Sequence, residues 1–307
     1  MLKSVLLTGA GLLALMPLAY ADQSVNFSPE SVSVGTSLSV LNGESREFVY
    51  DEGVKSSQLN WKINNAPVIK AGITWDPLSW LSLNANGWTT LASRGSGMDD
   101  YDWSYPSQSH WSDRSSSPDT HLNFANQLDL NVTGWLLNED NLHLGAVVGY
   151  QETRFSWLAE GGHYTYDNGA NVGDFPRGER TIGYQQRYRV PYLGLTGKYV
   201  YQDFDITAQF KFSPWVEARD HDEHYMRDLS FNETASNSNY YSGTINAGYN
   251  ITSQARVFTE LSWTRFSEGR GDSTVHDKVT GDSEHYNDAA GIQNYNYAIG
   301  AGIEYRF

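Results

Sequence analysis

The C-terminal stretch "NYNYAIGAGIEYRF" (residues 294–307) alternates strictly between two kinds of side chain. The apolar set consists of Tyr295, Tyr297, Ile299, Ala301, Ile303 and Tyr305. The intervening positions are polar or small, and the chain ends at Phe307. Successive side chains of a β-strand point to opposite faces, so this pattern predicts a strand with one apolar and one polar face. Strands in the wall of a membrane barrel have such faces, one toward lipid and one toward the lumen.

The same period-two alternation recurs upstream. It is clearest at 128–136, 142–150 and 204–212, where every second residue is mostly apolar. Further strands are expected at 33–41, 59–75, 81–91, 193–201, 241–251 and 257–263. Many segments of this kind predict many membrane-crossing strands.

The connections between these strands alternate in length. Short polar turns are expected near 76–77, 138–141, 201–203 and 251–254. Long connections rich in Ser, Gly and Asp are expected at 43–58, 93–123, 153–188, 213–240 and 265–292. Short periplasmic turns and long extracellular loops are typical of outer-membrane barrels. The sequence therefore predicts an all-β fold, a ten-stranded antiparallel transmembrane β-barrel in a single domain.

The N-terminus has the pattern of an export signal. Lys3 precedes an apolar run from Val5 to Leu18, and Ala19-Tyr20-Ala21 follows in the small-x-small pattern of a cleavage site. The run is shorter than the roughly 20 residues that a membrane-spanning helix needs. We therefore expect a signal peptide at 1–21 and the barrel domain at 22–307.

Composition excludes several functions. The chain has 36 acidic residues against 21 Lys and Arg, and it has no cysteine. Disulfides, thiol catalysis and thiolate metal sites are therefore excluded. A net charge of −15 disfavours nucleic acid as a partner and favours cationic ones.

Two acidic clusters fall in the long connections. One is "DHDEH" (220–224) and the other lies within "GMDDYDW" (97–103). If both are extended, residues two apart share a face. Asp220, Asp222 and His224 then face one way, and His221 and Glu223 face the other. By the same parity, Asp100 and Asp102 share a face that Asp99 and Tyr101 do not.

Spacing alone leaves three interpretations of these clusters open. A solvated acidic loop is the usual fate of such charges. An Asp/Asp/His set could bind a divalent cation, although His221 and His224 would lie on opposite faces of a strand. The third interpretation is acid–base catalysis, because a carboxylate bonded to an imidazole fixes its tautomer and raises its basicity.

The residues also carry a family resemblance. The stretches "GWTTLASRGSG", "MDDYDW", "NQLDLNVTGWLLNE", "GYQETRFSW", "IGYQQRYRVPYLGLTG", "DHDEHYMRDL" and "AGIEYRF" occur in order along the chain. Together they resemble the omptin family of ten-stranded outer-membrane proteases of Gram-negative bacteria. The sequences "MDDYDW" and "EHYMRDL" are most similar to those of the plasminogen-activator branch of that family.

The resemblance implies an aspartyl-type endopeptidase facing the cell exterior. Its catalytic residues would be Asp100, Asp102, Asp222 and His224, which activate a water without a covalent acyl-enzyme. Cleavage beside Arg or Lys would depend on two acids of the primary specificity pocket, Glu47 and Asp220. Cationic peptides and proteins are the implied substrates, with plasminogen and antimicrobial peptides as candidates.

The resemblance further implies a requirement for lipopolysaccharide, and no other cofactor or metal. The matching phosphate-binding residues are Tyr150, Glu152, Arg154 and Arg187. A basic residue that some omptins add from the fourth loop has no clear counterpart here, because polar "SNSN" (236–239) occupies that region. Without the resemblance, the arginines would also fit a surface ion pair with Glu152.

Three alternatives remain. A barrel acting as an adhesin or a passive pore would use the acids only to line its mouth. A metalloprotease would lose activity in EDTA. A lipase-type barrel would need a nucleophilic serine near a histidine, and none of the loop serines sits in a recognisable arrangement of that kind.

Overall fold

The structure is a computed structural model that describes residues 24–92, 95–105 and 107–307. The expected signal peptide lies outside the described residues. No helix in the described part of the chain is both long and apolar enough to cross a membrane.

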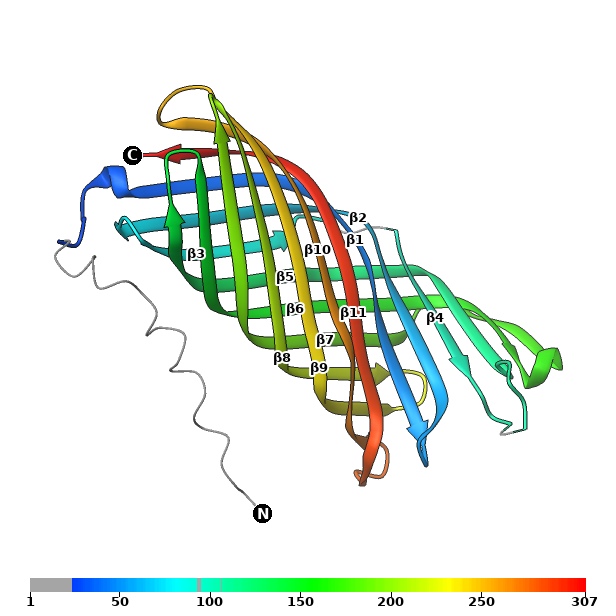
Figure 1. Cartoon of the computed structure of the whole chain (residues 1–307). Coiled ribbons are helices and arrows are strands. Elements are labelled where there is room, and N and C mark those ends of the chain that lie inside the picture. Colours follow the sequence, from blue (N-terminus) through cyan, green and yellow to red (C-terminus); the bar gives the residue numbers. More distant parts are fainter. Residues whose placement is uncertain (1–23, 93–94, 106) are drawn as a thin grey trace, which may run out of the picture.

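The fold is a closed antiparallel barrel (Figure 1). Its strands are β1 (Val32–Asp51), β2 (Val54–Leu78), β3 (Leu81–Thr90), β4 (Ser96–Asp102), β5 (Asp113–Asn138), β6 (Leu142–Tyr166), β7 (Asn171–Tyr201), β8 (Phe204–His224), β9 (Leu229–Asn250), β10 (Ala255–Asp277) and β11 (Ser283–Arg306). Strands β3 and β4 both lie between β2 and β5, so they share one position in the wall. The barrel closes where β1 pairs with both β11 and β2. The predicted ring of ten antiparallel strands is confirmed.

The lipid-facing pattern of the C-terminal strand is also confirmed. On β11, Tyr297, Ile299 and Ile303 are exposed, whereas Asn296 and Ala298 are buried toward the lumen. On β8 the exposed apolar residues run from Phe204 to Trp215. Apolar side chains on the outer wall are stable only against lipid, so this part of β8 spans the membrane.

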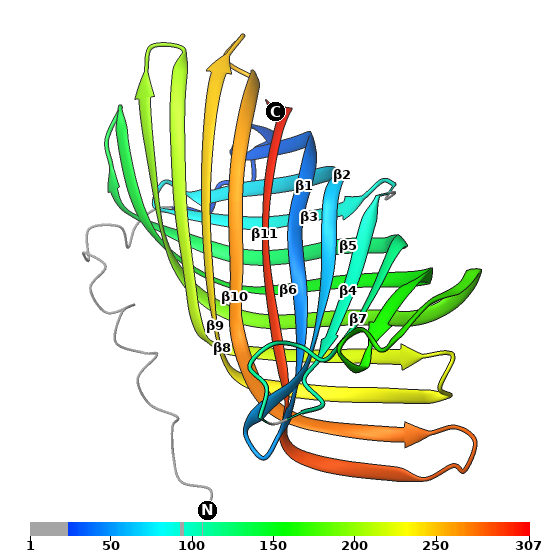
Figure 2. The same cartoon turned by 90° about the vertical axis from the view of Figure 1, so that its right-hand side faces the viewer.

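The long connections differ from the prediction, because most of their residues are in strands. The region 43–58 consists of the ends of β1 and β2, which meet in a tight turn at Glu52 and Gly53. Both of these turn residues have positive φ, 47° and 82°. Beyond the lipid the outer face of a strand meets water, and the inner face of these extensions carries polar and charged residues, so the apolar–polar alternation that marks a strand in the sequence disappears. Figure 2 shows the strands continuing far at the end of the barrel that lies opposite to the C-terminus.

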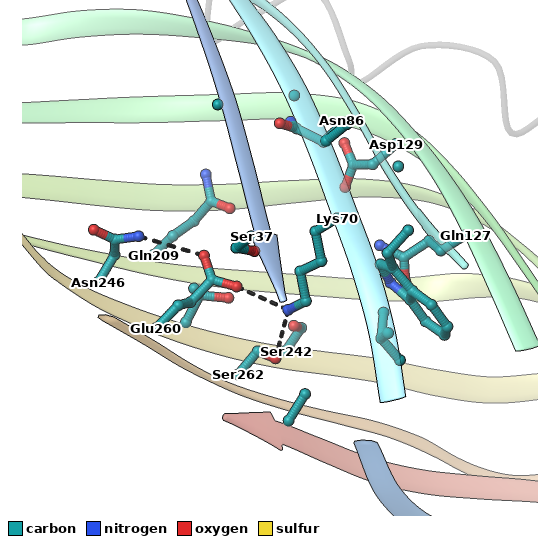
Figure 3. Close-up of a pocket in the computed structure, with 18 of the residues that line it drawn as sticks. Ser37, Lys70, Asn86, Gln127, Asp129, Gln209, Ser242, Asn246, Glu260 and Ser262 are labelled. Atoms are coloured by element: carbon teal, nitrogen blue, oxygen red, sulfur yellow. Dashed lines mark hydrogen bonds and ion pairs between the residues drawn. The ribbon is translucent and has the colours of Figure 1, made fainter. Parts of the chain in front are cut away.

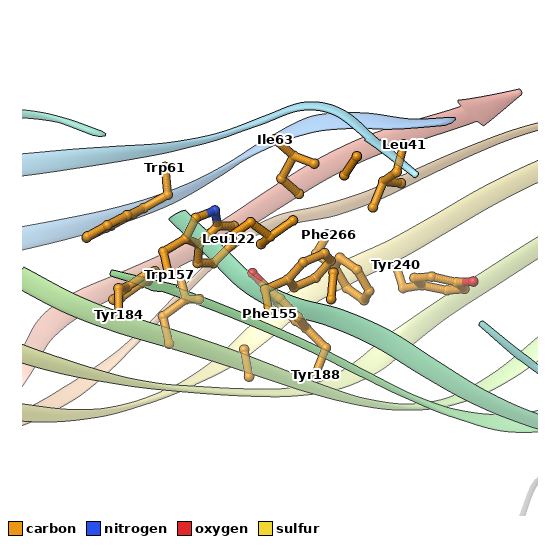
Figure 4. Packing of buried hydrophobic residues seen from close by; sticks show 14 of the residues in the cluster. Leu41, Trp61, Ile63, Leu122, Phe155, Trp157, Tyr184, Tyr188, Tyr240 and Phe266 are labelled. Atoms are coloured by element: carbon orange, nitrogen blue, oxygen red, sulfur yellow. The ribbon is translucent and has the colours of Figure 1, made fainter. Parts of the chain in front are cut away.

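Buried aromatic side chains fill the lumen beneath these extensions (Figure 4). Trp61 of β2 stacks on Tyr184 of β7 with ring centroids 5.1 Å apart, and Tyr188 of β7 stacks on Phe266 of β10 at 3.9 Å. These strands are not neighbours in the sheet, so the rings meet across the lumen. The aromatic layer is the hydrophobic core that holds opposite walls of the barrel together.

A polar cavity of about 290 Å³ lies in the lumen among residues such as Gln127, Ser242 and Asn246 (Figure 3). Lys70 donates to Glu260 at 2.8 Å within it. Lys211 pairs with Asp129, which also accepts a hydrogen bond from Tyr192 at 2.7 Å. Burying a charged side chain is costly unless it has a partner of opposite charge. Each of these ion pairs meets that requirement.

Candidate active site

The segment "DHDEH" ends strand β8, above its membrane-spanning part. It is extended, so the predicted division between two faces is confirmed. Asp220 and Asp222 are buried at 7% and 1% exposure. His221 lies on the outer face, where its Nδ1 is 3.0 Å from the Asn232 side chain. Glu223 also lies outside and pairs with Lys278.

His224 and Asp222 form a hydrogen-bonded pair. His224 Nε2–H donates to Asp222 Oδ2 at 2.8 Å. Burial alone lowers the pKa of His224, but the charge and hydrogen bond of Asp222 outweigh it and raise that pKa above its usual value. The Asp222 carboxylate therefore both orients the imidazole and stabilises its protonated form.

Asp100 and Asp102 lie on β4, which is held between β2 and β5. Burial, followed by the charge of Asp102, raises the pKa of Asp100 to about 8. Burial also raises the pKa of Asp102. The charges of Asp222 and His224 act on Asp100 as well, which brings the two predicted pairs into one site. Carboxyls with pKa values raised in this way retain protons at higher pH than exposed ones do.

The neighbouring Asp99 is surrounded by hydrogen-bond donors, two of them cationic, and its pKa is lowered where that of Asp100 is raised. It accepts hydrogen bonds from Lys62 at 2.8 Å, Arg114 at 2.9 Å and Ser116 at 2.8 Å. Although burial opposes it, these donors lower the pKa of Asp99 to about 2. Asp99 thus fixes β4 to β2 and β5, and this rigid support positions Asp100 and Asp102.

Glu47 and Asp220, the predicted pocket acids, lie on opposite sides of the lumen just above the aromatic layer. Glu47 is on β1 and is 2% exposed. Tyr184 donates to Asp220 Oδ2 at 2.9 Å, and Gln186 donates to the Tyr184 hydroxyl at 2.7 Å. Burial raises the pKa of Glu47, and the charges of Asp222, Glu233 and Asp220 raise it further. The structure therefore brings both predicted acids into one buried group of carboxyl side chains.

Sequence reasoning missed one member of this group. Glu233 is 1% exposed and pairs in register with Asp220 across the β8–β9 ladder. Alternation within "NETAS" (232–236) shows that Glu233 and Ala235 share a face. Which face points inward depends on the register of β9, and one sequence does not give that register.

The four residues that resemble the lipopolysaccharide site meet on the outer wall. Glu152 accepts from Arg187 at 2.7 Å and also pairs with Arg154. Tyr150 lies two residues below on β6 and is 46% exposed, at the edge of the apolar band. The structure adds Arg189, which is 3.3 Å from both Glu152 and Glu217. The result is an exposed basic cluster above the lipid-facing wall.

Within the described ranges, no group of three or more His, Cys, Asp and Glu side chains has the arrangement of a metal site.

Residues 28–307 match the model of the omptin family. The chain is 54% identical over 285 residues to the plasminogen activator of Yersinia pestis, covering 92% of this chain and 91% of that one. It is 43% identical to protease 7 of Escherichia coli K12, with 97% and 98% covered.

A solved structure gives the same result. The crystal structure of the outer membrane protease OmpT from Escherichia coli superimposes with a TM-score of 0.89 at 44% identity. The match covers 93% of this chain and 99% of that one.

Proposed function

The chain belongs to the omptin family of outer-membrane proteases, and from that premise we propose that it is an Asp–His endopeptidase that cuts beside basic residues. The observation that carries the proposal is the buried His224–Asp222 pair in one site with Asp100 and Asp102. In this arrangement His224 is the general base, and Asp100 and Asp102 are the acid pair that holds a proton in the same cleft.

In the proposed reaction a water between His224 and the Asp100–Asp102 pair attacks the scissile carbonyl. His224 takes the proton from this water, and Asp222 stabilises the imidazolium that forms. The proton shared by Asp100 and Asp102 hydrogen-bonds the oxyanion of the tetrahedral intermediate. His224 then gives its proton to the leaving amine, so the reaction needs no covalent acyl-enzyme.

We propose Arg or Lys as the residue beside the cut bond, bound by Glu47 and Asp220. Both acids are buried, and neither Glu47 Oε2 nor Asp220 Oδ1 has a hydrogen-bond partner within the described chain. A cationic side chain would supply the missing donors and neutralise the buried charge. Cationic peptides and proteins, plasminogen and antimicrobial peptides among them, are the corresponding substrates.

The catalytic proposal is tested by two histidines of one strand. His224→Ala is expected to lower kcat/KM for an Arg-Arg fluorogenic peptide by at least about 100-fold, the usual effect of losing a general base. His221→Ala is the matched control, because His221 lies on the outer face of β8, and it should keep wild-type activity. Equal activity of His224→Ala and wild type would favour a non-catalytic adhesin or pore. Loss of activity in EDTA would favour a metalloprotease instead.

We also propose that lipopolysaccharide activates the protein through Tyr150, Glu152, Arg154 and Arg187. Arginine forks bind phosphate bidentately, and this cluster lies where the outer-leaflet headgroups would be. The purified protein should cleave only after lipopolysaccharide is added, and Arg187→Ala should raise the amount needed. Arg265→Ala, which removes an exposed arginine of β10, should not. Full activity of the lipid-free protein would contradict this requirement.

A further inference from the structure

Glu233 is a buried acid that the proposed reaction does not use. It lies on β9 with 1% of its surface exposed. Ser273 and Asp220 lie beside its carboxyl group, but neither carboxyl oxygen makes a hydrogen bond of normal geometry within the described chain. Leaving a buried carboxylate unpaired is costly, so such a group is retained where a ligand completes its hydrogen bonds.

Glu233 points toward the same group of acids as Glu47 and Asp220. It is the register partner of Asp220 on β8, and β10 places Ser273 on its other side. The charges of Glu233 and Asp220 both act on Glu47 from across the lumen. Three acids on β1, β8 and β9 therefore converge above the aromatic layer.

From this convergence we infer that Glu233 is a third carboxylate of the primary specificity pocket and binds the guanidinium of a substrate arginine. The inference rests on the proposed function, because it assigns a further residue to that same pocket. Four carboxyl oxygens of the three acids make no hydrogen bond of normal geometry within the described chain, namely Glu47 Oε2, Asp220 Oδ1 and both oxygens of Glu233. A lysine ammonium has three donors and an arginine guanidinium has five in a planar fork, so arginine fits this set better.

The charges around Glu233 make this binding depend on pH. The titratable groups whose charges couple to Glu233 are Asp220 and Asp222 on β8 and Glu47 on β1. Burial, followed by the charge of Asp220, raises the pKa of Glu233, and burial raises that of Asp220 to about 8. The empty pocket therefore retains protons at neutral pH. A bound cation favours the ionised acids, so binding releases protons and strengthens as the pH rises from 6 to 9.

Two measurements test the role of Glu233. The first is kcat/KM for two peptides that differ only in Arg or Lys beside the cut bond, with lipopolysaccharide present. Glu233→Gln should lower kcat/KM for the Arg peptide by about tenfold, mostly through KM, and should reduce the Arg over Lys preference. Glu233→Gln should fold, because the amide has the shape of the carboxyl group and cannot ionise in this buried site. Glu223→Gln is the matched control, since Glu223 lies nearby on the outer wall paired with Lys278, and it should behave as wild type.

The second measurement is independent of catalysis. Binding of n-propylguanidinium is followed by calorimetry in buffers of different ionisation enthalpy, which counts the protons released. Glu233→Gln should weaken binding by about tenfold and release fewer protons, while Glu233→Asp should restore part of both. An unchanged Kd and unchanged proton release in Glu233→Gln would overturn the inference. If wild-type protein binds the probe and Glu233→Gln weakens that binding, but wild type cleaves neither peptide, the proposed function fails and Glu233 stands only as a guanidinium-binding residue.

Discussion

At the scale of the residue, strand parity separates side chains that are adjacent in the sequence. His221 and His224 lie three residues apart, yet one contacts Asn232 on the outer wall and the other bonds the buried Asp222. Parity within a strand can be read from one sequence, so the division of "DHDEH" was predictable. The convergence of Glu233 with Asp220 was not, because it depends on the register between two strands.

The pH dependence of catalysis belongs to this scale. The base requires neutral His224, whose pKa is raised mainly by Asp222 against the effect of burial, and the acid pair requires the proton on Asp100, whose pKa is about 8. A plot of kcat/KM against pH should therefore rise as His224 deprotonates and fall as the Asp100–Asp102 pair loses its proton.

Asp100→Asn tests the descending limb of that profile. The amide still donates a hydrogen bond but does not titrate, so the fall near pH 8 should disappear while the rise remains. Persistence of the same descending limb in Asp100→Asn would assign it to another group.

At the scale of the element, the strands are longer than their sequence pattern indicates. The alternating segment 204–212 is only the lipid-facing part of β8, which continues to His224. Lipid imposes alternation, but the extracellular extensions are stabilised by ladder hydrogen bonds and by side chains such as Asp99, which bridges to Lys62 and Arg114. Those contacts join distant parts of the chain, so sequence periodicity does not reveal them.

Close approach between β9 and β10 provides a test at this scale. A Cβ added at Gly271 would overlap the carbonyl oxygen of Thr234, the neighbour of Glu233. Gly271→Ala should therefore push the strands apart, with a cost of about 1–3 kcal/mol and a lower Tm. Gly243→Ala is the control, because no atom lies within 4 Å of its added Cβ. Equal Tm values for the two variants would show that the pairing tolerates the extra methyl group.

At the scale of the whole molecule, the barrel combines a lipid-facing wall, an aromatic layer and an acidic cleft above it. The chain carries a net charge of −15, and among the described residues Glu47, Asp220 and Glu233 have no ion-pair partner, whereas Asp222 pairs with His224. This arrangement favours cationic substrates and reduces stability where the acids ionise. The barrel was predictable because lipid imposes the two-residue period on every membrane-crossing segment.

The effect on stability has a definite sign. Asp100 and Asp220 have folded pKa values of about 8, above their unfolded values, so the folded state binds more protons than the unfolded state between pH 4 and 8. The raised pKa of His224 acts in the same direction. The free energy of unfolding should therefore fall as pH rises, and Tm should be lower at pH 9 than at pH 6. The double variant Asp100→Asn/Glu233→Gln should show a smaller difference, and a higher wild-type Tm at pH 9 would contradict this electrostatic picture.

The most direct test of the proposed protease activity is a mass-spectrometric cleavage profile of a random peptide library. Wild type and His224→Ala would be compared with and without lipopolysaccharide. Cuts beside Arg and Lys are expected for wild type with lipopolysaccharide, and none for His224→Ala. Cuts without preference for basic residues, or the same cuts by His224→Ala, would contradict the assignment of the acidic cleft as an Asp–His protease site.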